Sequence, residues 1–231
     1  MENSSLRDAF VNREKRFMLL DRGCVRADFR KDAQLLEIGC AGVEAAQHMS
    51  EQGYTHITAI DIDGDVLVEA QKKAPSCTFL CANACALPFD EESFDGIYSE
   101  AAFALITDKC AAAKEYARVL RHGGRILLND FALRKTTNSE RRSVEGIPML
   151  MGVQTMDCYR SLFEDAGLRC VYEKEEFYEL ARIASSLSKT YQIPLSQVGE
   201  YLVSAFGRDE FVNDFFSQAQ MSYCQMIFEK G

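Results

Sequence analysis

The chain has 231 residues, of which 47% are hydrophobic, and 35 acidic against 26 basic residues give it a net charge of −9. This length fits one α/β domain with room for an insertion, and the apolar content excludes a disordered chain. The acidic balance disfavours nucleic acid as a partner, because proteins that bind phosphate backbones usually gather positive charge.

The sequence also bears on the compartment. No apolar run approaches the roughly 20 residues that a membrane-spanning helix needs. The first ten residues lack the basic-then-apolar order of a secretion signal, and nine cysteines without such a signal indicate free thiols in a reducing compartment. We therefore expect a cytoplasmic protein without a membrane span, acting on a small molecule as a monomer or homodimer.

In chain order, an amphipathic helix is expected over residues 6–20, and strands and helices then alternate as far as residue 133. Strands are expected at 35–39, 57–61, 78–82, 96–99 and 125–131, and helices at 43–51, 65–74 and 108–120. Nearly continuous apolar strands that alternate with helices are typical of a parallel sheet covered on both faces. Gly123 and Gly124 are expected to turn the chain sharply into the strand 125–131.

The last 98 residues have a different pattern. A helix is expected over 155–166, with Thr155 as its cap, followed by a strand at 168–172. Residues 179–219 contain three helical stretches, broken at Pro194 and Gly207, before a final strand at 222–228. The last two strands should pair antiparallel, so the residues between them, 177–220, are expected to form a helical cap.

Residues 35–46, LLEIGCAGVEAA, are the most informative stretch. An apolar strand runs into a glycine turn and then into a helix, an arrangement that lets a nucleotide or nucleoside approach the backbone. A dinucleotide-binding fold has Gly-x-Gly-x-x-Gly directly after the strand. Here the order is Glu37-x-Gly39-x-Ala41-Gly42. It disfavours a nicotinamide-dependent oxidoreductase and favours S-adenosylmethionine, whose cationic amino acid moiety tolerates a nearby carboxylate better than a pyrophosphate does.

Four motifs in order carry a family resemblance across residues 33–135: LLEIGCAG, AIDID, NACALPFDEESFDGIYS and EYARVLRHGGRILLND. Together they resemble class I S-adenosylmethionine-dependent methyltransferases, in the small-molecule branch that includes the ubiquinone/menaquinone and arsenite methyltransferases. The resemblance implies a single domain over 1–231, with a cofactor-binding core at 33–135 and the cap at 177–220. It implies a Rossmann-like, seven-stranded, mostly parallel sheet with helices on both faces, an N-terminal helix and a helical insert before the last strand.

The resemblance also assigns roles around the cofactor S-adenosyl-L-methionine, whose product is S-adenosyl-L-homocysteine. Asp61 would accept from both ribose hydroxyls, although it could instead cap the next helix. Glu37 would anchor the amino acid end, or belong to a structural network at the turn. Asn83 and Ala84 would contact adenine. The expected cofactor-binding residues are Glu37, Gly39, Cys40, Gly42, Asp61, Ile62, Asn83, Ala84 and Ser99.

The sequence departs from the family pattern at three places. Ala41 and Val43 stand where the family has glycines, so Gly42 must take the tight conformation or the loop must be reshaped. Asn83 replaces an aspartate, and its amide oxygen still accepts but without charge assistance. His122 replaces a proline and is interpreted as a turn residue.

We expect methyl transfer to a small-molecule acceptor by in-line displacement, over the carboxyl ends of the strands 96–99 and 125–131. Glu100 and Asp130 are the catalytic candidates, as a base or as groups that orient the acceptor, and each is equally explained as a structural or solvated carboxylate. The loop 145–160, with Met156 and Tyr159, is expected to help close the site.

Three further hypotheses concern the acceptor, a metal site and turnover. Arsenite as acceptor requires thiolates, but Ala101 stands at one position where the family has a cysteine, and Cys110 and Cys158 are displaced from the expected places. A metal site is not expected, because no Cys-x-x-Cys pair occurs. A methyltransferase-like partner or sensor that binds the cofactor without turnover is the alternative function.

Overall fold

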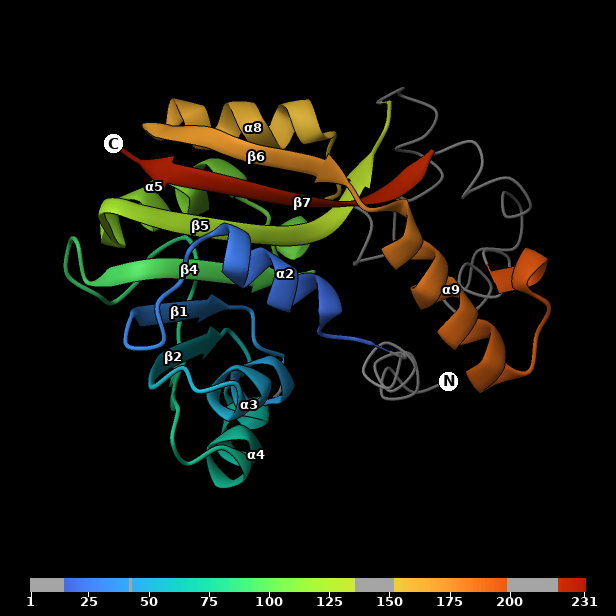
Figure 1. The fold of residues 1–231 in the computed structure, drawn as a ribbon, viewed down its shortest axis with the longest axis horizontal. Coiled ribbons are helices and arrows are strands. Elements are labelled where there is room, and N and C mark those ends of the chain that lie inside the picture. The colour runs from blue at the N-terminus through green and yellow to red at the C-terminus, as the bar shows by residue number, and fades with distance from the viewer. Residues whose placement is uncertain (1–14, 42, 136–151, 199–219) are drawn as a thin grey trace.

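A computed structural model describes residues 15–41, 43–135, 152–198 and 220–231. Seven strands form one sheet in the order β3-β2-β1-β4-β5-β7-β6 (Figure 1). They are β1 (Gln34–Ile38), β2 (His56–Asp61), β3 (Thr78–Cys81), β4 (Phe94–Glu100), β5 (Leu120–Leu133), β6 (Leu168–Glu175) and β7 (Met221–Lys230). The first five strands pair in parallel, and β7 runs antiparallel to both β5 and β6. The predicted mostly parallel, seven-stranded sheet is confirmed.

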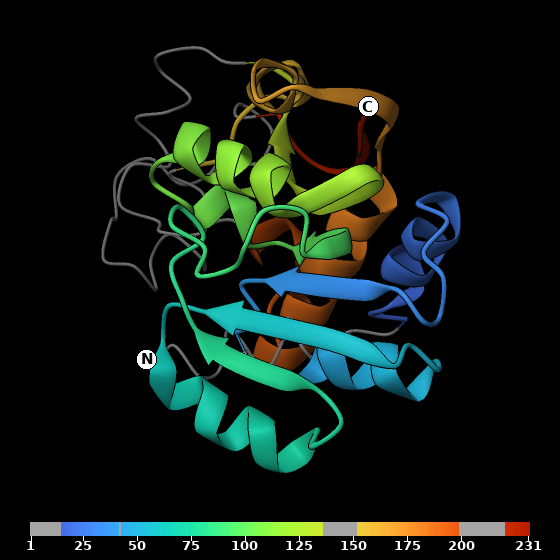
Figure 2. The ribbon, with the colours of Figure 1, turned by 90° about the vertical axis from the view of Figure 1, so that its left-hand side faces the viewer.

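Helices cover both faces of this sheet, as the sequence predicts. One face packs against α2 (Met18–Arg26), α3 (Glu44–Glu51) and α4 (Gly64–Lys73), and the other against α5 (Lys109–Val119) and α8 (Met156–Asp165). Figure 2 shows α5 and α2 on opposite sides of the sheet. Alternate strand residues face opposite sides, so Ile97 of β4 joins the α5 side and Tyr98 joins the α2 side.

Three helices begin at side-chain caps. Thr155 Oγ1 accepts from the backbone N–H of Cys158 at 3.2 Å, which confirms the predicted start of α8. Asp108 caps α5 in the same way. The cap of α4 is Asp63, whose carboxylate accepts from the Asp65 N–H at 3.0 Å. The alternative interpretation of Asp61 as this helix cap is therefore wrong.

Two predicted boundaries are corrected by close packing at glycine. The sequence predicts that the N-terminal helix ends at residue 20, but α2 continues to Arg26. Residues 6–14 of the predicted helix lie outside the described part. Gly23 does not break α2 because it faces the sheet, where a Cβ would lie 2.6 Å from Leu127. Similarly, β5 starts at Leu120, before the glycine pair, because Leu120 already pairs with Phe94 and pairing resumes at Arg125 after an irregularity. Within this irregularity a Cβ on Gly124 would lie 2.9 Å from the Asp95 carbonyl of β4.

The connection between β6 and β7 contains α9 (Phe177–Tyr191) and the short 3-10 helix η2 (Leu195–Gln197), while residues 199–219 lie outside the described part. Figure 1 shows α9 beyond the carboxyl ends of β1 and β4. Ile183 and Leu187 of α9 pack in one cluster with Phe131 and Tyr223. None of the described helices combines the length and the apolar character needed to cross a membrane.

Candidate functional site

A cavity of about 470 Å³ opens at the carboxyl ends of β1, β2, β3 and β4. In parallel α/β sheets this edge is where ligands bind. Two large apolar side chains beside it remain exposed, Ile62 at 74% and Leu105 at 50%. The lining residues predicted from sequence are Gly39, Asp61, Ile62, Asn83, Ala84 and Glu100, so the fold brings six of the predicted site residues to one cavity.

Gly39 makes the tight turn out of β1. Its φ of +71° lies in the left-handed region, and a Cβ there would lie 2.4 Å from the Cβ of Ala102. The backbone N–H groups of Gly39 and Cys40 donate to the Ile60 carbonyl at 2.9 and 3.0 Å. Only glycine fits this conformation and this close approach without strain, so the turn holds the cavity wall in place.

Two alanines at the cavity also adopt left-handed backbone conformations, Ala41 with a φ of +45° and Ala101 with a φ of +55°. Such conformations cost an alanine roughly 1–2 kcal/mol each and tend to gather at functional sites. Ala41 therefore adopts a conformation that glycine would reach without strain. The predicted cofactor residue Gly42 lies outside the described residues.

Asp61 ends β2 and ties the glycine loop to that strand. Its Oδ2 accepts from the Ala41 N–H at 2.7 Å, and its Oδ1 accepts from the Asp63 N–H at 3.0 Å. A carboxylate offers about four lone-pair sites. These two contacts therefore leave acceptor capacity at the cavity for hydroxyl donors.

Asn83 and Ala84 line the cavity after β3. The Asn83 Oδ1 accepts from the Cys85 N–H at 2.9 Å, which forms an Asx turn. The side-chain oxygen that the resemblance assigns to adenine thus also holds the local turn, while the backbone of Ala84 lies at the cavity.

Three predicted cofactor residues do not line this cavity: Glu37, Cys40 and Ser99. Glu37 is 2% exposed and accepts a hydrogen bond from the Tyr98 hydroxyl at 3.0 Å. Burial raises the pKa of Glu37 to about 8. Cys40 is buried in the cluster under α2 and α3, and the buried Ser99 Oγ has no hydrogen-bond partner among the described residues.

The two catalytic candidates lie in different environments. Glu100 lines the cavity and accepts a hydrogen bond from Asn129 Nδ2. Asp130 is fully buried, and its carboxylate accepts from the N–H groups of Ala104 at 2.9 Å and Phe131 at 2.7 Å. Burial raises the pKa of Asp130 to about 7. Asp130 therefore fastens the start of the β4–α5 connection to β5.

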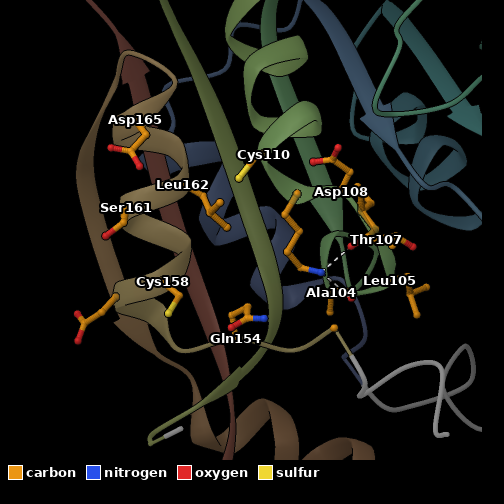
Figure 3. A pocket seen from close by; sticks show the side chains of 14 residues that line it. Ala104, Leu105, Thr107, Asp108, Cys110, Gln154, Cys158, Ser161, Leu162 and Asp165 are labelled. Atoms are coloured by element: carbon orange, nitrogen blue, oxygen red, sulfur yellow. Dashed lines mark hydrogen bonds between the residues drawn. The ribbon is translucent and has the colours of Figure 1, made fainter. Parts of the chain in front are cut away.

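A second, more open cavity of about 880 Å³ lies between that connection and α8 (Figure 3). Lys109 Nζ donates to the carbonyls of Ala104 at 3.0 Å and Ile106 at 2.6 Å, the dashed lines in Figure 3. Residues 105–108 line both cavities and so form a wall between them.

Cys110 and Cys158 both line the second cavity, on the far side of this wall from Gly39 and Asp61. Cys85 is the one thiol among the described residues that line the first cavity. Since As(III) binds several thiolates, this arrangement gives no support to arsenite as the acceptor. No group of three potential metal ligands gathers within the described ranges.

Tyr159, which was expected in a closing loop, is instead a core residue of α8. It is fully buried, and its hydroxyl donates to the Phe131 carbonyl at 3.1 Å. Residues 145–151 of the expected loop lie outside the described part. The usable signal for a core position was that Tyr159 lies one helical turn after Thr155, inside the predicted helix 155–166.

Sequence reasoning missed Leu105 as a contributor to the site, and it placed Asn129 there only as one of several residues at the carboxyl ends of two strands. Leu105 lies in a short connection without periodicity, so no local pattern marks it as a cavity residue. Asn129 contacts Glu100 from the neighbouring strand. The position of Asn129 at the end of a predicted strand was a usable signal, because carboxyl ends of adjacent parallel strands meet at one edge.

Comparisons with known proteins agree with this geometry. Residues 36–128 match the family model described as a methyltransferase domain. The chain is 28% identical to the 27-O-demethylrifamycin SV methyltransferase of Amycolatopsis mediterranei, over 65% of this chain and 59% of that protein. Alignments to the first three curated relatives cover 61%, 47% and 59% of their lengths.

Solved structures share the fold. Phosphoethanolamine N-methyltransferase 2 of Haemonchus contortus, in complex with phosphomonomethylethanolamine and S-adenosylhomocysteine, superposes with a TM-score of 0.67 at 16% identity, covering 94% of this chain and 54% of that chain. The [4+2]-cyclase SpnF superposes with a TM-score of 0.72 at 18% identity, covering 92% and 80%. The fold therefore hosts more than one chemistry, and function must be argued from the site.

Proposed function

We propose that this protein is a class I S-adenosylmethionine-dependent methyltransferase, which transfers a methyl group from S-adenosyl-L-methionine to a small-molecule acceptor. The match of residues 36–128 to the methyltransferase domain model supports the proposal. The observation that carries the proposal is the single cavity that joins Gly39, Asp61, Asn83 and Glu100 at the carboxyl edge of the sheet. The released product would be S-adenosyl-L-homocysteine.

The residues around the cavity fit this cofactor. The glycine turn at Gly39 opens a path along the backbone, and Asp61 retains acceptor capacity for the two ribose hydroxyls. Ile62 and Leu105 offer exposed apolar surface suited to the faces of a purine. When bound, S-adenosylmethionine supplies a methyl group already activated by its sulfonium.

Because the methyl group arrives activated, the chain needs chiefly to position the acceptor and exclude water. Glu100 is the proposed acceptor-facing group, since its carboxylate lies at the cavity at the end of β4. It would orient an acceptor through a hydroxyl or amine hydrogen, or take a proton from it. Asp130 is proposed in a supporting role, because its contacts hold the backbone of the β4–α5 connection.

The cofactor site is tested by Asp61→Ala. We expect the dissociation constant for S-adenosylmethionine, measured by calorimetry, to rise at least tenfold, which corresponds to about 1.4 kcal/mol. The matched control is Asp63→Ala, which removes the cap of α4 next to the cavity but no residue that lines it. That variant should lose about 1 kcal/mol of stability and keep its affinity. An unchanged affinity in Asp61→Ala removes Asp61 from the site.

The reaction is tested by assaying release of S-adenosylhomocysteine with a panel of hydroxyl and amine acceptors. Acceptor-dependent release supports a methyltransferase. Tight binding of S-adenosylmethionine without release across the panel would instead identify a cofactor-binding partner or sensor.

A further inference from the structure

Four side chains from four elements form a chain of hydrogen bonds that ends at the cavity. Arg26 Nη1 of α2 donates to Gln225 Oε1 of β7 at 2.6 Å. Gln225 Nε2 donates to Asn129 Oδ1 of β5 at 2.9 Å, and Asn129 Nδ2 donates to Glu100 Oε1 of β4. The strand register places Glu100, Asn129 and Gln225 directly opposite one another on three adjacent strands.

The direction of this chain is fixed by chemistry. A guanidinium has donors and no acceptor, so Gln225 must turn its oxygen toward Arg26 and its amide N–H groups the other way. Those N–H groups donate to Asn129 Oδ1 and to the Leu19 carbonyl of α2, both at 2.9 Å. Asn129 must then present its own N–H to Glu100. The Glu100 carboxylate therefore accepts from an amide whose orientation is set, through Gln225, by Arg26.

The two middle side chains of this series of hydrogen bonds are buried. Asn129 and Gln225 are fully buried, where each unmade hydrogen bond costs about 1–3 kcal/mol. Helix α2 reaches Gln225 because Gly23 has no side chain: a Cβ there would lie 2.7 Å from Gln225 Nε2. A nonpolar core would bring α2 equally close, so packing alone does not explain polar groups at these positions.

We propose that Arg26, Gln225 and Asn129 are positioning residues that hold the Glu100 carboxylate in one orientation toward the methyl acceptor. This inference rests on the proposed function. It assigns a role in acceptor turnover to residues on α2, β5 and β7, of which none lines the cavity, and it separates that role from cofactor binding.

The first test is Gln225→Glu, which keeps the size of the side chain and reverses the direction of the hydrogen bond between position 225 and Asn129. A glutamate still accepts from Arg26 but cannot donate to Asn129, so the Asn129 amide must flip and turn its oxygen toward Glu100. We expect kcat for the best acceptor to fall at least tenfold, while the dissociation constant for S-adenosylhomocysteine changes less than twofold. Unchanged kcat in a folded Gln225→Glu variant overturns the proposal.

The second test asks whether turnover needs the Glu100 carboxylate itself or only an intact hydrogen bond at this position. Asn129→Asp removes the donor to Glu100 and keeps the acceptor for Gln225, so melting temperature and kcat should both fall. In the double variant Asn129→Asp, Glu100→Gln, the new amide donates to the new carboxylate and the hydrogen bond returns. Melting temperature should recover, whereas kcat should stay at least tenfold low because no carboxylate faces the acceptor. Recovery of kcat would overturn the proposal.

A crystal structure of Gln225→Glu makes the inference testable apart from the proposed function. If the wild-type protein binds S-adenosylhomocysteine but turns over no acceptor, the proposed function fails. The positioning role of Arg26, Gln225 and Asn129 then depends on one observation: in the Gln225→Glu crystal structure, the Glu100 side chain should no longer face Asn129 as it does in the wild type. Retention of that orientation contradicts the inference.

Discussion

Ala41, which lines the 470 Å³ cavity, has a left-handed backbone conformation that lowers the stability of the fold, and one substitution should relieve this strain. Its φ is +45°, and its N–H is held by Asp61. Ala41→Gly should relieve roughly 1 kcal/mol of strain and raise the melting temperature by about 2–4 °C. Scanning calorimetry checks this. Ala45→Gly, in the buried part of α3, is the contrasting variant and should lower the melting temperature.

Glu37 makes the stability of the fold depend on pH. Its pKa is raised from 4.5 to about 8 by burial, against a Tyr98 hydrogen bond that lowers it. Between these values the folded chain binds more protons than the unfolded chain, so the free energy of unfolding falls as pH rises. Buried Asp130, with its pKa at about 7, acts in the same direction.

Glu37→Gln should therefore make unfolding less sensitive to pH. A neutral amide replaces the protonated acid, so the decline in urea midpoint between about pH 5 and pH 8 should be shallower than in the wild type. Part of the decline should remain, because Asp130 is still present. Glu69→Gln, at an exposed pair with Lys72, should leave the decline unchanged. An unaltered slope in Glu37→Gln contradicts the burial argument.

At the scale of elements, we expect the segment between β6 and β7 to be separable from the proposed cofactor site. Residues 175 and 224 are paired across these antiparallel strands, so a short turn can join β6 to β7 directly. The described residues of this segment, 177–198, contribute none of the lining of the 470 Å³ cavity. Its helix α9 instead packs Ile183 and Leu187 against the ends of β5 and β7.

Replacing residues 177–220 by a glycine-rich turn should spare S-adenosylmethionine binding and abolish acceptor-dependent turnover. Some stability should be lost, because Phe131 and Tyr223 lose their apolar neighbours on α9. Calorimetry and the S-adenosylhomocysteine release assay measure the two effects. Loss of cofactor binding in a variant that still unfolds cooperatively would show that the segment belongs to the cofactor site and is not a separate cap.

At the scale of the whole molecule, β7 links the helices on the two faces of the sheet. It lies between β5 and β6, and eight of its ten residues are buried. Phe228 packs on Phe163 of α8 on one face, and Gln225 contacts α2 on the other. The last strand in sequence therefore closes the core on both sides of the sheet.

Truncation before Met221 should consequently prevent folding altogether. It would leave β5 and β6 each without a partner along the edge that β7 occupies, and it would expose the apolar groups that β7 covers. Circular dichroism and size-exclusion chromatography should show an unfolded or aggregated chain. Removal of Gly231 alone, an exposed residue beyond the strand, is the control and should give a folded protein.

The order of the elements and six of the residues that line the 470 Å³ cavity could be predicted because their signals are local. Apolar runs mark the buried strands, Thr155 and Asp108 cap the predicted helices, and Gly39 and Asp61 follow strands directly. The carboxyl ends of parallel strands meet at one edge by geometry alone. The residues at the carboxyl ends of those strands therefore gather at one cavity once the strands are adjacent and parallel.

The tertiary structure decided which polar residues face the cavity and which brace it. Asn129 and Asp130 are neighbours on β5 and point to opposite faces, so one contacts Glu100 and the other fastens the backbone at Ala104. Strand register sets this difference, and no local pattern contains it. Contact between Asn129 and Gln225 likewise depends on β7 pairing with β5 across 96 residues of sequence. The sequence determined the fold class through local patterns and indicated a nucleoside-binding turn, whereas side-chain roles at the site depended on long-range pairing.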